Sequence, residues 1–91
     1  MELENPMTFD DAVLAVKTLA TSPTNEEKLQ IYALFKQSML GDNTTPAPGY
    51  FDFAGSAKWK AWSNVKGLPT DTAKTQYISL VQSLIAKYGV K

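Results

Sequence analysis

The chain has 91 residues, with nine lysines, no arginine and nine acidic residues, so its formal net charge is zero. A chain of this length predicts one domain, spanning residues 1–91. Neutrality argues against a nucleic-acid partner, because such proteins carry a basic excess over their phosphate footprint. The absence of cysteine and histidine argues against disulfides, the usual zinc and copper sites and the usual general base near neutral pH, so we expect neither a metal nor a cofactor.

The hydropathy pattern predicts no stable membrane insertion, because no stretch approaches about 18 consecutive apolar residues. Residues 1–6 are acidic and lack an apolar signal region, so the simplest expected location is a reducing cytoplasm. Residues 1–35 hold six acids and two lysines, whereas residues 36–91 hold seven lysines and three acids. An anionic ligand would therefore meet lysines of the later part, although chance asymmetry of a solvated surface remains an alternative.

The first helix is predicted after Thr8, an N-cap residue followed by acids in the first turn, and it ends before Pro23. Its apolar positions, at helical spacing, are Phe9, Ala12, Val13, Val16 and Leu19. Thr24 and Glu27 form a capping box that begins a second helix, which runs to about Leu40 and ends at Gly41. The apolar arc of this helix is wide, so it is either central or uses a second face for something other than the core.

Residues 41–54 are predicted to form a long loop, and its aromatic residues Tyr50, Phe51 and Phe53 are candidates to hold it in place. A short third helix is expected over about 55–65, and a fourth from Thr70–Asp71 to Tyr88. The inward stripe of the fourth helix is expected to be Ala73, Tyr77, Leu80, Val81, Leu84 and Tyr88. Four helices with no strand pattern predict an all-α four-helix bundle.

Aromatic and lysine side chains share two helix faces. Tyr32, Phe35 and Lys36 lie at i, i+3 and i+4, a pattern that could stack a planar group and pair with a phosphate. Lys58 beside Trp59 and Trp62 repeats this chemistry. The alternative is that the aromatic residues belong to the core and the lysines to the solvated surface. Tyr77 alone is more typical of a core tyrosine, and no phosphate-binding loop or catalytic triad is present.

The order and spacing of several motifs resemble the acyl-CoA-binding protein family, from about Phe9 to Tyr88. The resemblance implies an up-down-down-up bundle that binds one acyl-CoA ester. The motifs that carry it are Ile31-Tyr32-Ala33-Leu34-Phe35-Lys36-Gln37, Gly41-Asp42, Pro48-Gly49 through Asp52-Phe53, Lys58-Trp59, Ala61-Trp62, Lys66-Gly67, Tyr77-Ile78 and Lys87-Tyr88-Gly89.

The resemblance also implies roles for individual residues. Tyr32 would stack near the adenine, Lys36 would pair with phosphate, and Lys58 would meet the phosphorylated ribose region. Tyr77 would contact the head group and Lys17 would lie close to the ligand, while the tryptophans serve mainly in packing. The acyl chain would be lined by Val13, Leu29 and Ile31. The implied ligand-contact set is Lys17, Leu29, Ile31, Tyr32, Phe35, Lys36, Ala54, Lys58 and Tyr77.

The chain departs from the family pattern at several of these positions. Phe35 stands where the family often has tyrosine, which removes one hydroxyl donor to phosphate, and Lys28 replaces a residue that is often apolar. Positions often held by a basic residue are occupied by Ser22, Ala47, Ala54 and Ser56. A hydrogen bond to a charged group contributes about 1.5–3 kcal/mol, so we expect weaker head-group binding than is usual in the family.

The leading hypothesis is a monomeric, non-enzymatic carrier that binds medium- to long-chain acyl-CoA esters one-to-one and maintains a pool of them. It would make transient contacts with acyl-CoA-using enzymes or membranes. The alternative is a helical protein-interaction module in which acyl-CoA affinity is weakened or lost. An enzyme such as a thioesterase or an isomerase is less favoured, because the chain lacks a recognisable catalytic motif.

Overall fold

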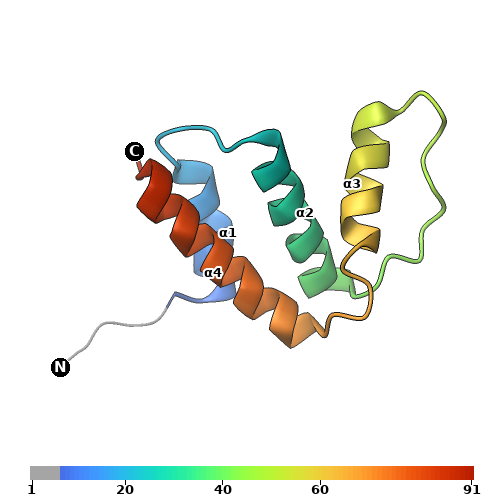
Figure 1. The fold of residues 1–91 in the computed structure, drawn as a ribbon. Coiled ribbons are helices and arrows are strands. Elements are labelled where there is room, and N and C mark those ends of the chain that lie inside the picture. The colour runs from blue at the N-terminus through green and yellow to red at the C-terminus, as the bar shows by residue number, and fades with distance from the viewer. Residues whose placement is uncertain (1–6) are drawn as a thin grey trace.

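The computed structural model describes residues 7–91, so the expectation about the acidic segment 1–6 lies outside the described residues. The helices are α1 (Phe9–Ala15), α2 (Asn25–Leu40), α3 (Phe53–Ser63) and α4 (Thr70–Tyr88), and a 3₁₀ turn, η1 (Val16–Thr18), extends α1. Helices α1 and α4 run in one direction, and α2 and α3 run in the opposite one (Figure 1). The predicted all-α, up-down-down-up fold is therefore confirmed.

The core lies where α4 packs against α1 and α2. Ala12, Leu34, Tyr77 and Val81 form a buried cluster with one or more residues from each of these helices. Helix α3 packs on α2 and on no other helix within residues 7–91, so it stands at one side of the bundle (Figure 1). This arrangement places the groups of the α2–α3 seam away from the main core.

Both predicted helix starts on the first two helices are confirmed. The hydroxyl of Thr8 accepts a hydrogen bond from the backbone N–H of Asp11 at 3.1 Å, and the Asp11 carboxylate accepts from the Thr8 N–H at 3.1 Å. Thr24 and Glu27 form the same reciprocal pair, at 3.1 and 2.8 Å. These bonds satisfy N–H groups that have no partner inside a helix.

Helix α3 begins two residues earlier than predicted, at Phe53 rather than Gly55, and ends at Ser63. The cause is Asp52, whose carboxylate accepts a hydrogen bond from the Gly55 N–H at 2.9 Å and so acts as the N-cap. A Cβ at Gly55 would press against the Asp52 carboxylate, so a larger residue there would have to displace this cap.

The loop between α2 and α3 is held by indole and amide groups. Trp62 Nε1 donates to the carbonyl of Gly41 at 2.9 Å, Trp59 Nε1 donates to that of Thr45 at 3.0 Å, and Asn43 Nδ2 donates to Ser63 Oγ at 3.0 Å. The prediction that this loop is held by its own aromatic residues is wrong. Those residues are exposed, by 89% at Tyr50, 80% at Phe51 and 77% at Phe53. Unpaired loop carbonyls need donors, and an indole N–H supplies one where a phenyl ring does not.

A second polar junction joins the end of α2 to the segment before α4. The carboxylate of Asp42 accepts hydrogen bonds from Gln37 Nε2 and from the Gly67 N–H, both at 2.8 Å. Gln37 Nε2 also donates to the Leu68 carbonyl at 2.8 Å. These hydrogen bonds hold the pKa of Asp42 below its usual value. The Gly41-Asp42 motif therefore fixes the connection between α2 and the later helices.

Candidate ligand-binding site

Two lysine ammonium groups converge on one tyrosine ring at the α2–α3 seam. Lys36 Nζ lies 5.8 Å from the centroid of the Tyr32 ring, and Lys58 Nζ lies 5.5 Å from the same centroid. Lys36 Nζ is also 5.2 Å from the Trp62 ring. The faces of the rings attract the ammonium groups. Because the two ammonium groups carry the same charge, an anion between them would be stabilised by both.

These four residues line a pocket of about 310 Å³. Its wall comes from α2, from α3 and from the loop before α3, and it contains no carboxylate. The lining residues are Tyr32, Lys36, Thr45, Pro46, Pro48, Gly55, Lys58, Trp59 and Trp62. Flat aromatic and proline surfaces with two cations are suited to a planar group that carries phosphate.

The secondary structure explains why these side chains meet. Tyr32 and Lys36 are four residues apart on α2 and therefore share a face. Lys58 comes from α3, which packs directly on α2. Trp62, with an exposed fraction of 5%, is buried in the seam and bonded to Gly41, so it fixes the floor of the pocket. Trp62 is thus packed into the seam and also lines the pocket.

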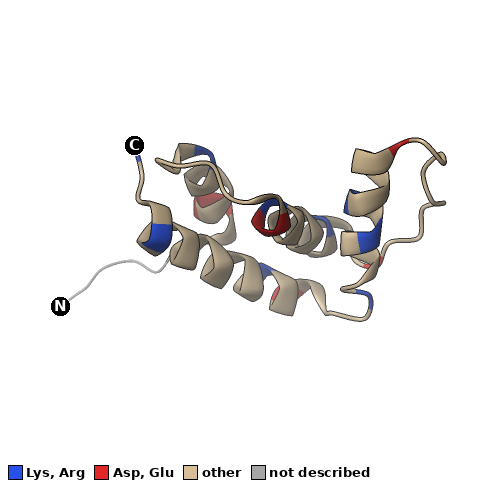
Figure 2. Cartoon of the chain, turned by 45° about the horizontal axis from the view of Figure 1, so that its top comes forward, with Lys and Arg blue, Asp and Glu red and all other residues tan. Residues whose placement is uncertain are grey.

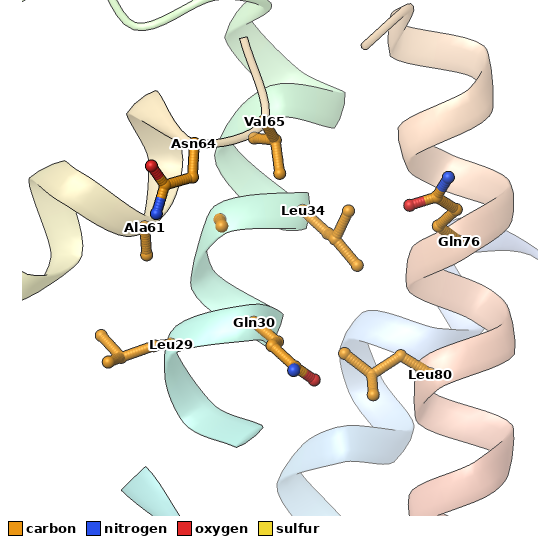
Figure 3. Close-up of a pocket in the computed structure, with 9 residues that line it drawn as sticks. Leu29, Gln30, Leu34, Ala61, Asn64, Val65, Gln76 and Leu80 are labelled. Atoms are coloured by element: carbon orange, nitrogen blue, oxygen red, sulfur yellow. The ribbon is translucent and has the colours of Figure 1, made fainter. Parts of the chain in front are cut away.

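A second, largely apolar pocket of about 420 Å³ lies between α2, α3 and α4. Figure 3 shows Leu29, Leu34, Val65 and Leu80 around this hollow, with the amides of Asn64 and Gln76 at its edge. Leu29, predicted to line an acyl chain, therefore borders apolar space. The hollow shares no lining residue with the lysine–tyrosine pocket.

Phe35 and Tyr77 lie together in an aromatic cluster with Phe9 of α1. The ring centroids of Phe35 and Tyr77 are 6.3 Å apart, and that of Phe9 is 6.1 Å from Phe35 and 5.0 Å from Tyr77. Tyr77 is almost fully buried, and burial raises the pKa of its phenol. Ile31 is partly buried against the same core. This cluster is on the core side of α2.

Lys17 and Ala54 lie apart from the lysine–tyrosine pocket. Lys17 is on η1 and lines a separate pocket with Lys91 and the segment before α2. Ala54 is exposed in the first turn of α3. Among the nine predicted contact residues, Tyr32, Lys36 and Lys58 are therefore the ones that the structure brings into one pocket.

Sequence reasoning did not select four residues of this pocket, namely Thr45, Pro46, Pro48 and Gly55. The Pro48-Gly49 motif drew attention to one of these four positions, Pro48, but gave it no role in binding. The path of a loop over a helix cannot be derived from helical periodicity. Within residues 7–91, no group of histidine, cysteine or acidic residues could hold a metal ion, and no helix is long and apolar enough to cross a membrane.

Comparisons with known proteins agree with this arrangement. The family model for acyl CoA binding protein matches residues 7–81. The acyl-CoA-binding protein homolog 1 of Caenorhabditis elegans is 59% identical over 83 residues, which cover 91% of this chain and 96% of that protein. The crystal structure of Oryza sativa acyl-CoA-binding protein 2 superposes with a TM-score of 0.83 at 37% identity, covering 87% of this chain and 88% of that one.

A match to an enzyme is restricted to a small part of that enzyme. Enoyl-CoA delta isomerase 2 of Rattus norvegicus is 49% identical over 76 residues, which cover 84% of this chain and 19% of the isomerase. The matched region is thus a minor part of a much longer protein.

Proposed function

Because the chain belongs to the acyl-CoA-binding protein family, we propose that it binds one medium- to long-chain acyl-CoA ester and acts as a carrier and pool former. The observation that carries the proposal is the convergence of Lys36 and Lys58 on the Tyr32 ring in a pocket without carboxylates. In this proposal the adenine stacks near Tyr32, and the two ammonium groups pair with phosphate oxygens. The relatives with high identity are named for acyl-CoA binding, which supports the same ligand class.

The acyl chain is proposed to lie along apolar surface of the first two helices, including Val13, Leu29 and Ile31. All three are partly buried, so they retain apolar surface that a ligand could cover. Each methylene removed from water contributes about 0.8 kcal/mol, so four additional methylenes add about 3 kcal/mol. The head group would select the ligand class, and the tail would set the preference for chain length.

The remaining contacts of the proposed site are Lys17, Phe35, Ala54 and Tyr77. Phe35 and Tyr77 adjoin one another, and each would have to meet the head group from the core side of α2. Lys17 would approach the ligand from η1, and Ala54 from the first turn of α3. We propose these four as ligand contacts of lower energetic weight than Lys36 and Lys58.

The proposal describes binding and transport without a bond-breaking step. The neutral chain, lacking cysteine, suits a monomeric domain of residues 1–91 in a reducing cytoplasm, with transient contacts to membranes or to enzymes that use acyl-CoA. It needs no metal or cofactor, and it involves no nucleic acid. Incubation with palmitoyl-CoA and a thiol reagent tests the absence of catalysis, because release of free thiol would reveal a thioesterase.

Calorimetric titration of palmitoyl-CoA, octanoyl-CoA, free CoA and palmitate tests the carrier function directly. Lys36→Ala is expected to weaken both acyl-CoA and free CoA by about 10- to 100-fold, because it removes a charge-assisted contact that both ligands share. Lys60→Ala, on the same helix as Lys58 but outside the pocket, is the matched control and should bind as the wild type does.

Unchanged affinities in Lys36→Ala would contradict the assigned head-group site. If the wild-type chain bound none of the four ligands, the interaction-module alternative would replace the carrier function.

A further inference from the structure

Three aromatic side chains project into solvent at the tip of the loop that leads into α3. We call Tyr50, Phe51 and Phe53 the aromatic tip; their exposed fractions are 89%, 80% and 77%. Tyr50 and Phe51 contact edge to face, with ring centroids 5.2 Å apart. Exposed single apolar residues are ordinary on a protein surface, whereas several exposed rings within four residues of the chain are typical of a surface that contacts a partner or a membrane.

The loop that carries the aromatic tip is anchored on both sides rather than loosely attached. The indole N–H groups of Trp59 and Trp62 hold loop carbonyls, and Asp52 caps α3 between the exposed rings. The segment that leads into α3 lies at the outer side of the molecule, away from α1 and α4 (Figure 1), and the three rings that it carries are exposed there. We propose that the aromatic tip is a lipid contact that enters the interfacial layer of an anionic bilayer.

The carboxylate of Asp52 lies between these rings in sequence but does not oppose this contact. It accepts the Gly55 N–H at 2.9 Å, so it is turned back onto the start of α3. The positive end of the helix dipole compensates its charge there. The rings flanking it remain free to enter an apolar layer, where aromatic side chains are favoured at the headgroup boundary.

The charge of α3 complements an anionic surface. The helix carries Lys58 and Lys60 and no acidic residue (Figure 2). Lys60 follows Phe53 by seven residues, so it lies on the same helix face, about 10 Å further along the axis. That spacing would set its ammonium group at the phosphate level when Phe53 reaches the interface, whose depth is about 5–10 Å.

A bilayer explains these features better than a protein partner does. The exposed rings line neither of the two hollows described above, so they add no surface to a groove that a partner helix could enter. A soft apolar layer needs no complementary shape. The same loop contributes Pro46 and Pro48 to the lysine–tyrosine pocket. If the proposed function holds, lipid contact would bring the mouth of that pocket to the surface from which acyl-CoA is taken up.

Sedimentation with vesicles tests the lipid contact without any acyl-CoA, so its outcome is independent of the proposed function. Wild-type protein is expected to bind phosphatidylcholine vesicles weakly and phosphatidylcholine–phosphatidylserine vesicles more tightly. The combined variant Tyr50→Ser, Phe51→Ser and Phe53→Ser should lose binding by at least about tenfold on both vesicles. Lys60→Ala should lose about fivefold on the serine-containing vesicles alone.

The matched control replaces three other exposed apolar residues, as Leu14→Ser, Met39→Ser and Leu40→Ser. Circular dichroism confirms folding of every variant, and titration of acyl-CoA without lipid should give wild-type affinity for the aromatic-tip variant. Wild-type protein that stays in the supernatant with both vesicles would overturn the proposal and leave the tip as a contact for a protein. An equal loss in the control variant would overturn it as well.

Discussion

At position 35, phenylalanine lacks the hydroxyl oxygen that a tyrosine would have, and this difference is expected to change the affinity for the head group. Its ring is part of the cluster with Tyr77, 6.3 Å away, and it is partly exposed one residue before Lys36. Phe35→Tyr would restore the hydroxyl that the family often has at this position, which could donate to the head group from the core side of α2, and we expect free CoA and acyl-CoA to bind about tenfold more tightly. Isothermal titration measures this gain. Phe53→Tyr, which adds the same hydroxyl to a ring outside the pocket, should change neither affinity.

If Phe35→Tyr left both affinities at the wild-type values, position 35 would not face the head group. Its place in the set of ligand contacts would then be lost, while that of Lys36 would stand.

The sequence predicted individual residues well where helical spacing decides their position. The i, i+4 spacing placed Tyr32 beside Lys36, and the capping box placed Glu27 beside Thr24. Lys58 is different, because periodicity gives a face of α3 but not the helix that faces it. The family resemblance implied a role for Lys58 at the phosphorylated ribose, but its approach to Tyr32 depends on tertiary packing, which no spacing within one helix contains.

At the scale of elements, the buried amide of Gln37 couples the end of α2 to the segment before α4. Its Nε2 donates to Asp42 and to the Leu68 carbonyl, while its Oε1 is buried without a partner. Gln37→Leu should lower the free energy of unfolding by about 2–4 kcal/mol, because two acceptors lose their donor and the removed Oε1 offsets only part of this. Urea denaturation followed by circular dichroism measures the change.

Ser38→Ala is the matched control for this junction. Ser38 is also buried, but its hydroxyl donates only to the Leu34 carbonyl in its own helix. We expect a loss within about 1 kcal/mol. A cost for Gln37→Leu no larger than this would show that the junction does not couple the two segments.

The sequence predicted helix boundaries correctly where it contains a recognisable capping residue, but it misplaced the start of α3, which follows the loop. The beginning of α2 at Asn25 and the ends of α2 and α4 before Gly41 and Gly89 agree with their capping signals. Helix α3 begins two residues before its predicted start because Asp52 caps it. This cap was not recognised in the sequence, because Asp52 lies between aromatic residues that were assigned to the loop. The loop itself could not be predicted, since its shape depends on which carbonyls the indoles of α3 reach.

At the scale of the whole molecule, the carboxylate of Glu27 joins the start of α2 to the end of α4. It accepts hydrogen bonds from Tyr88 Oη at 2.6 Å and from Lys87 Nζ at 2.9 Å, in addition to the Thr24 N–H. The hydroxyl of Tyr88, the Thr24 N–H and Lys87 together lower the pKa of Glu27 from 4.5 to about 2. The start of α2 is thereby tied to the end of α4.

This depressed pKa predicts how the fold responds to acid. Because the folded chain holds the carboxylate ionised, the stability that Glu27 contributes is fully present above its unfolded pKa of 4.5 and is lost as pH falls toward about 2. Glu27→Gln should therefore be less stable than wild type at neutral pH, and the difference in thermal midpoint should shrink between these two pH values. Thermal unfolding followed by circular dichroism across this range measures it. Glu26→Gln is the control, because it removes a neighbouring exposed acid without these partners, and it should leave the wild-type pH profile unchanged. If Glu27→Gln also gave the wild-type pH profile, the contact between α2 and α4 would not depend on the charge of Glu27.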